Sequence, residues 1–321
     1  MKKRNLIVAA VLLVVLIGIV GAVGVNKANS AAESYKHQVA VWKDTKFSTA
    51  AHGVTTAAFS NDVIVDRLET AAELKAESTH CDALKQTQKT VAGLMAPPLG
   101  THPFGLLSGN YKAASLKSKN LHSSLAAYQA QAAQPLSEIT TYCSVYIKEA
   151  QLGQEQAKAQ ADLKALSDPY GPTSATGTIC NNPAGCAPAD GSKLAAYRTA
   201  FEKLYIDLYQ KQYALEGTKS CPLTDLRPVC AVTDQFAPKL KSADAAYADV
   251  LKNSSTIVGS AALLKASQDS QAILTQYKNA KNAAYLKLSP GYDTTDSHAP
   301  VKLQVLLLKK YEATLAGLQL R

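Results

Sequence analysis

The stretch that decides how this chain is organised is Met1–Val25, MKKRNLIVAAVLLVVLIGIVGAVGV. Basic residues at 2–4 precede the run Leu6–Val25, which contains no charged side chain. At a rise of about 1.5 Å per residue, a helix of this run is about 30 Å long, which matches the hydrocarbon thickness of a bilayer. The sequence therefore predicts a cytoplasmic segment at 1–5, a transmembrane helix at 6–25 and an extracytoplasmic remainder.

A cleaved secretory signal is the alternative to a retained signal-anchor. Such signals have apolar stretches of about 7 to 15 residues that end at a small-residue cleavage site. Ala28–Ser30 and Ser30–Ala32 both fit a cleavage site, but the longer apolar run favours retention. The expected location is the cell membrane, with a single span and the bulk of the chain outside the cytoplasm. Cleavage would make the chain a secreted protein.

The rest of the sequence predicts an all-α fold, an elongated, disulfide-stapled extracytoplasmic helical bundle. Alanine is abundant and the alternation typical of strands is nearly absent. A Pro/Gly-rich loop at 168–191 divides the expected bundle into a first half, 26–167, and a second half, 192–321. Helices are expected at 61–95, 111–133, 135–166, 192–217, 238–253, 256–288 and 300–320. The clearest has a coiled-coil spacing of apolar residues, carried by Leu194, Tyr197, Phe201, Leu204, Leu208 and Leu215.

Six cysteines in a segment placed outside the cytoplasm predict three disulfides. Proximity and helical phase favour the pairs Cys81–Cys143, Cys180–Cys186 and Cys221–Cys230. The first pair joins the apolar faces of two predicted helices and closes about sixty residues, which is worth about 4 kcal/mol on the chain-entropy model. The two short loops would each contribute about 2 to 3 kcal/mol. A zinc site is disfavoured because the sequence has no C-x-x-C pair and no paired histidines.

The formal net charge of +9 bears on which partners the chain could bind. Without the basic residues at 2–4 the remaining charge is spread over a long chain. This mild bias is consistent with anionic lipid headgroups or envelope polymers nearby, and it is too dilute to indicate nucleic-acid binding. The expected partners are the membrane and a protein or envelope polymer of unknown identity.

Glu77 and His80 form a Glu-x-x-His pair on one face of a predicted helix. Di-iron bundles use this spacing, but they need a second such pair and two further glutamates, which this sequence lacks. Glu77 is therefore interpreted as part of an acidic stripe on the solvated side of the helix. The stripe consists of Asp62, Asp66, Glu69, Glu73 and Glu77.

Tyr205, Tyr209 and Tyr213 repeat at i, i+4 and i+8 along the clearest helix. Tyrosines at the edge of an apolar stripe are typical of boundary packing, and they also suit a contact surface for a protein or glycan partner. The sequence contains none of the short motifs of hydrolases, nucleotide-binding proteins or EF-hands. No catalytic, cofactor-binding or metal-ligating residue is predicted.

These features favour a noncatalytic, membrane-anchored protein with a structural or protein-interaction role in the cell envelope. Two alternatives remain open from the sequence. One is a metal-dependent envelope enzyme on a helical bundle that uses Glu77 and His80. The other is a small-ligand-binding protein with a pocket near 168–191.

Overall fold

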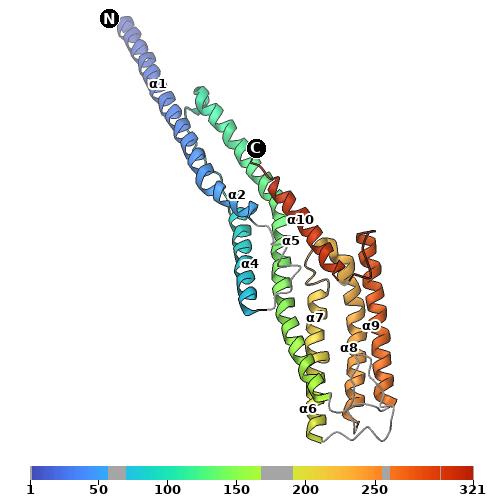
Figure 1. Cartoon of the computed structure of the whole chain (residues 1–321). Coiled ribbons are helices and arrows are strands. Elements are labelled where there is room, and N and C mark those ends of the chain that lie inside the picture. Colours follow the sequence, from blue (N-terminus) through green and yellow to red (C-terminus); the bar gives the residue numbers. More distant parts are fainter. Residues whose placement is uncertain (1, 57–69, 168–190, 255–260, 297, 321) are drawn as a thin grey trace. The chain divides into compact units, whose positions relative to one another are not determined.

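The computed structural model describes residues 2–56, 70–167, 191–254, 261–296 and 298–320, with the side chains of the first helix described from residue 19 onward. Throughout these ranges the regular structure is helical (Figure 1). The predicted all-α class is therefore confirmed for this part of the chain. The predicted Cys180–Cys186 pair lies outside the described residues.

The helices differ in several bounds from the predicted ones. They are α1 (Lys2–Trp42), α2 (Ser48–Thr55), α4 (Ala71–Ala92), α5 (Gly109–Ser167), α6 (Gly191–Phe201), α7 (Tyr209–Glu216), α8 (Arg227–Lys252), α9 (Ala261–Leu288) and α10 (Ala299–Ala316). π-Helical segments at Lys43–Phe47 and Glu202–Leu208 join α1 to α2 and α6 to α7. Short 3-10 turns at Gly105–Leu107 and Thr224–Leu226 precede α5 and α8.

Two predicted interruptions at prolines are wrong. α5 continues through Pro135, and α8 begins at Arg227 and continues through Pro238. A proline inside a helix removes one backbone hydrogen bond, which is why the sequence pattern placed a boundary at each. Leu136 and Leu240, which follow these two prolines, are almost fully buried. The packing of these residues stabilises the helix enough to offset the lost bond.

None of the helices, over the residues that the structure describes, combines the length and the apolar character needed to cross a membrane. Most of the predicted span at 6–25 falls on α1 residues whose side chains lie outside the description.

The chain divides into two compact units, each assembled from separated stretches of sequence. Unit 1 contains Met1–Ala58, Leu84–Ser137 and Glu312–Arg321, and unit 2 contains Phe59–Ala83 and Glu138–Tyr311. The division into halves that the sequence predicts at 168–191 falls on residues outside the description for nearly all of that loop, and it stays a prediction.

In unit 1, α1 packs on the start of α5 through small residues. Ala32, Tyr35 and Ala114 form a buried cluster, and the two alanines let the helices approach closely. Ser108 caps α5, because its Oγ accepts a hydrogen bond from the Tyr111 backbone N–H at 3.0 Å. The same Oγ donates to Oδ1 of Asn29 at 2.5 Å, which ties the start of α5 to α1.

In unit 2, the last part of α5 packs with α6–α7, α8 and α9, which run side by side in Figure 1. The predicted coiled-coil stripe is confirmed as the core face of α6–α7. Its members Leu194, Tyr197, Phe201, Leu204 and Leu208 are buried, and Leu215 is half-buried. One cluster joins Phe201 to Leu251 of α8 and Leu263 of α9. The apolar faces of these helices therefore meet in one bundle.

Two of the three predicted disulfides are confirmed among the residues that the structure describes. Cys81 of α4 is bonded to Cys143 of α5, with their Cα atoms 5.6 Å apart and a sequence separation of 62. Cys221 is bonded to Cys230 in the first turn of α8 across a separation of 9 residues. Both Cys81 and Cys143 are buried, as the predicted apolar faces require.

We predict that the two disulfides stabilise the fold unequally. Replacing Cys81 and Cys143 together by alanine should lower the free energy of unfolding by about 4 kcal/mol, against about 2.5 kcal/mol for Cys221 and Cys230, because the longer closed loop constrains the unfolded chain more. Urea unfolding of the detergent-solubilised chain, followed by circular dichroism, measures both losses. Equal losses, or a free thiol at Cys81 in a mass spectrum of non-reduced peptides, would contradict this prediction.

Candidate functional site

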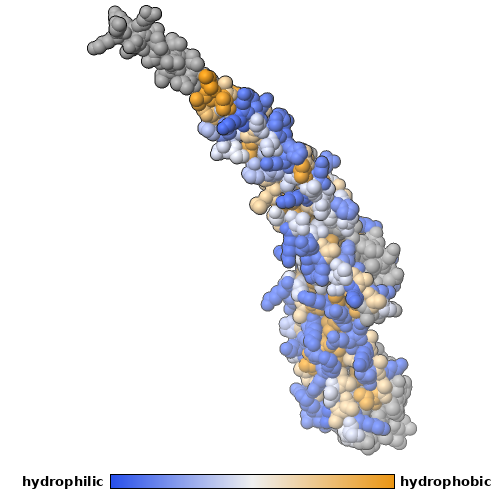
Figure 2. Space-filling view, turned by 90° about the vertical axis from the view of Figure 1, so that its left-hand side faces the viewer, coloured by the Kyte–Doolittle hydropathy of each residue, from blue (hydrophilic) through white to orange (hydrophobic). Residues whose placement is uncertain are grey.

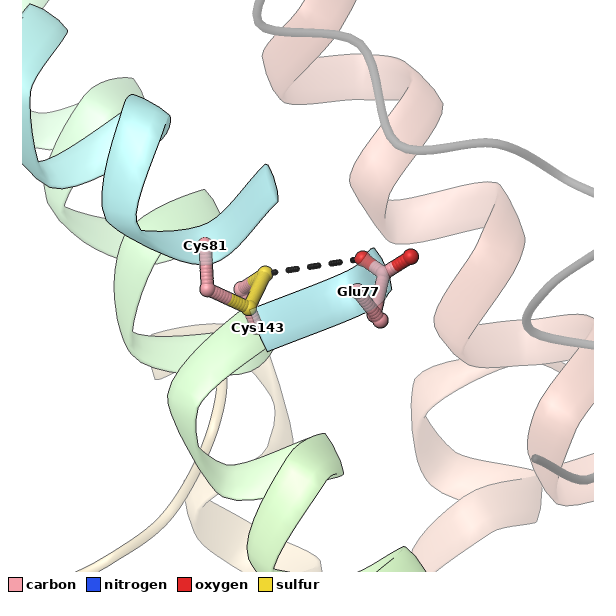
Figure 3. Close-up of side chains that lie close together, drawn as sticks. All are labelled: Glu77, Cys81 and Cys143. Atoms are coloured by element: carbon pink, nitrogen blue, oxygen red, sulfur yellow. Dashed lines mark hydrogen bonds between the residues drawn. A yellow bond between two sulfur atoms is a disulfide. The ribbon is translucent and has the colours of Figure 1, made fainter. Parts of the chain in front are cut away.

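The first candidate site is a buried cluster of Glu77, Cys81 and Cys143 in unit 2 (Figure 3). Glu77 lies one helical turn before Cys81 on α4, so that both side chains occupy the same face of the helix. An Oε atom of Glu77 is 3.7 Å from Sγ of Cys143, and the Glu77 side chain is only 7% exposed. A carboxyl group thus lies directly against the disulfide.

This burial corrects the interpretation of Glu77 as part of a solvated stripe. Glu73, one turn earlier, is exposed, whereas Glu77 continues the buried face that Cys81, Leu84 and Val91 define. The charge pattern and the heptad pattern coincide at this position, and packing decides the outcome. The other proposed members of the stripe, Asp62, Asp66 and Glu69, lie outside the described residues.

The chemistry of the Glu77 cluster depends on the state of its sulfurs. Burial raises the pKa of Glu77, and the nearby charge of His80 partly opposes this shift. The ligand atoms of Glu77, Cys81 and Cys143 lie within 4.8 Å of one another. A metal would need both sulfurs as thiolates, but they are bonded to each other. In its oxidised state the cluster therefore offers a metal one carboxylate, which does not suit a di-iron or a zinc site.

The second candidate site is an ion pair between Glu216 of α7 and Lys281 of α9, which sequence reasoning missed. Lys281 Nζ lies 2.7 Å from Oε2 of Glu216, and both side chains are only about one-fifth exposed. The Glu216 carboxylate also accepts hydrogen bonds from the Tyr277 hydroxyl at 2.8 Å and from Nε2 of Gln212 at 2.7 Å. Burial opposes ionisation, but Lys281 and these donors outweigh it and lower the pKa of Glu216.

Glu149 of α5 is a second carboxyl group beside this ion pair. Burial and the negative charge of Glu216 raise the pKa of Glu149 to about 7, against the opposing charge of Lys281. One cation is thus shared unequally between two carboxylates, because direct contact favours Glu216. Such a pair of acids with separated pKa values can store a proton at neutral pH.

The three tyrosines of the predicted contact surface lie together in a ladder along α6–α7. Ring centroids are 5.3 Å apart for Tyr205 and Tyr209 and 6.4 Å apart for Tyr209 and Tyr213. All three are half-buried, and each packs against a core cluster of unit 2. This arrangement is boundary packing, and a role for these rings in binding a partner stays a prediction.

One pattern in the sequence could have indicated the ion pair. Tyr277 follows Ile273 and Leu274 at helical spacing, and Lys281 follows Tyr277 at i+4. That spacing places the ammonium group on the same face, where it needs a buried anion. The identity of the anion, Glu216 at the end of another helix, depends on tertiary packing and has no local signal.

Comparison with known proteins finds no protein family, no curated protein and no solved structure that matches this chain. The function is therefore inferred from the residues and their geometry.

We predict that removing the cation of the ion pair destabilises unit 2. Lys281→Met should lower the free energy of unfolding by about 2–4 kcal/mol, because it leaves the Glu216 carboxylate buried without its partner. A matched control is Lys265→Met, since Lys265 pairs with Asp269 at an exposed site on the same helix, where we expect a loss below about 0.5 kcal/mol. Urea unfolding measures both, and equal losses would contradict a structural role for the ion pair.

We also predict that Glu149 makes stability fall as the pH rises. Its pKa is about 7 in the folded chain, compared with a usual value of 4.5. Between these two pKa values the folded state binds more protons than the unfolded state. The contribution of Glu149 to the free energy of unfolding is therefore greatest below pH 4.5 and declines until the pH reaches about 7. The slope of this decline is at most about 1.4 kcal/mol per pH unit.

Unfolding free energies of the unchanged chain and of Glu149→Gln, measured from pH 4.5 to 8, test this titration. The variant should lose the part of the decline that Glu149 causes, so its profile should be flatter between pH 5 and 7. Parallel profiles would show that Glu149 does not titrate in this range.

Proposed function

We propose that this chain is a noncatalytic, membrane-anchored extracytoplasmic protein whose helical units serve an envelope structural or protein-interaction role. The observation that carries the proposal is the uncharged run Leu6–Val25 together with the exposure of its described end. Ile19, Val20 and Val23 are 50 to 56% exposed, and the buried face of α1 begins at Gly24. Exposed apolar side chains at the end of an uncharged run of this length suit a lipid environment.

The two disulfides support the extracytoplasmic part of the proposal. Disulfides form and persist mainly in oxidising compartments outside the cytoplasm. The basic residues at 2–4 support the same orientation, because positive charge favours the cytoplasmic side of a membrane helix.

The environment of the buried acids supports a noncatalytic role. Glu77 lies against a disulfide, and Glu216 is paired with Lys281. Both carboxyl groups thus contact protein groups that hold helices together. The metal-enzyme alternative at Glu77 and His80 would need ligands that the oxidised cysteines do not supply, and the ligand-pocket alternative near 168–191 falls almost wholly outside the described residues.

Membrane extraction and topology mapping in a bacterial host test the proposal. The full chain should stay in the membrane fraction after carbonate washing and should be released by detergent. Val14→Arg combined with Leu16→Arg should release it or block its export, because each arginine costs about 2.5 to 3.5 kcal/mol in the centre of a membrane helix. Leu306→Arg, at an exposed site in α10, is the matched control and should leave membrane retention unchanged.

The orientation has its own readout. A tag at the C-terminus should be digested by protease added to spheroplasts, without disruption of the inner membrane. Protection of the tag, or release of the unchanged chain by carbonate, would contradict the anchored extracytoplasmic arrangement. The mass of the purified chain distinguishes a retained N-terminus from a cleaved one.

A further inference from the structure

The positive charge of the chain is concentrated in unit 1. This unit has 13 Lys and Arg against 3 Asp and Glu, whereas unit 2 has 21 against 22. Unit 1 therefore carries a net charge of +10, or +7 without the basic residues at 2–4 that the proposed anchor places on the cytoplasmic side, and unit 2 carries −1. No single window of sequence shows this excess, because unit 1 is assembled from separated stretches.

Unit 1 also presents two exposed leucines on a structured tip, residues 104–107. Leu106 is 79% exposed and Leu107 is 68% exposed. The backbone of the tip is held by hydrogen bonds from the N–H of Gly105 to His102 O at 2.9 Å and from the N–H of Leu107 to Phe104 O at 3.1 Å. The two leucines thus lie on an ordered turn. Binding a partner there would cost little conformational entropy.

The tip lies beside α1 at the end of the apolar run. The Phe104 ring packs on Gly24, where an added Cβ atom would overlap it, and Ser108 is hydrogen-bonded to Asn29. The tip is therefore level with residues 24–29 of α1. Asn29 is four residues beyond Val25, which corresponds to about 6 Å along a helix.

That distance equals the depth of the polar layer of a bilayer. Hydrocarbon of about 30 Å lies within a total thickness of about 40 to 45 Å, which leaves about 5 to 7 Å of headgroup layer on each side. Figure 2 shows apolar side chains gathered on α1 next to the point where its described side chains begin. At this end of α1, Ile19, Val20 and Val23 are exposed.

We propose that the tip rests in the headgroup layer of an anionic bilayer, with Leu106 and Leu107 directed toward the acyl chains and the lysines of unit 1 toward anionic headgroups. This inference rests on the proposed anchor at 6–25. Residues 83–137, which include the tip, contain five lysines and no acidic residue. Lysines near an anionic surface are attracted to it. Exposed leucines in the same segment favour a lipid surface over a nucleic acid, which offers no apolar contact at its phosphates.

Fluorescence quenching in lipid nanodiscs tests the proposal with the full chain. Leu106→Trp places an indole on the tip, and Leu107→Trp is a second variant at the neighbouring exposed position. We expect the added fluorescence to be lost when the nanodisc lipids are brominated near the headgroup end of their acyl chains, in discs that contain phosphatidylglycerol. The loss should be smaller in purely zwitterionic discs.

Two controls define the background of this measurement. The unchanged chain has one tryptophan, Trp42, which is buried and lies about 25 Å along the helix beyond Val25, outside the reach of brominated acyl chains. Leu306→Trp adds an indole at a site 61% exposed in unit 2. Neither should lose its fluorescence.

The outcomes separate this inference from the anchor on which it rests. If the chain enters nanodiscs but the tip indole is not quenched, the tip does not contact lipid and the inference alone fails. A chain that stays out of the discs would overturn the anchor and this inference together. Equal quenching of Leu306→Trp would indicate nonspecific adsorption and would overturn it, and equal quenching in zwitterionic discs would overturn the role of the lysines.

Discussion

The Cys81–Cys143 bond is the covalent constraint that joins α4 to α5 in unit 2. It fixes α4 against α5 at one register, and it does so from inside the core, where both sulfurs are shielded from solvent. Glu77 is buried as a consequence, because its position one turn before Cys81 leaves it no other direction. The cross-link thus holds the Glu77 carboxyl group in an apolar environment, and this burial raises its pKa.

Glu216 and Glu149, the other two buried acids, differ from each other in how their charged forms are stabilised. Glu216 is stabilised by a cation and by hydroxyl and amide donors from two helices, whereas Glu149 receives the same cation only at a distance. The same bundle therefore contains one carboxylate that stays ionised and one carboxyl that titrates near neutrality. The difference arises from direct hydrogen bonding, which burial by itself does not supply.

Local patterns predicted the elements of this fold better than their limits or their polar contacts. The heptad from Leu194 to Leu208 and the phases of Cys81 and Cys143 gave the core faces and one cross-link correctly, because both depend on periodicity along a single helix. Pro135 and Pro238 led to wrong helix boundaries, because the packing of the residues that follow overrides the tendency of proline to end a helix. Glu216 and Lys281 meet only through tertiary contact, and the charge of unit 1 becomes visible only when separated stretches are summed in space.

The contact between Gly24 and Phe104 has a consequence for how the chain would associate in a membrane. An anchor joined to its domain by a flexible linker can rotate freely about its own axis. Here α1 runs without a break from Lys2 to Trp42, and the Phe104 ring fits against one face of it at Gly24, where a side chain would collide with the ring. The rotation of α1 about its own axis is thereby fixed relative to the rest of unit 1. A neighbour that binds Ile19, Val20 or Val23 in the membrane would therefore also meet unit 1 in one fixed orientation.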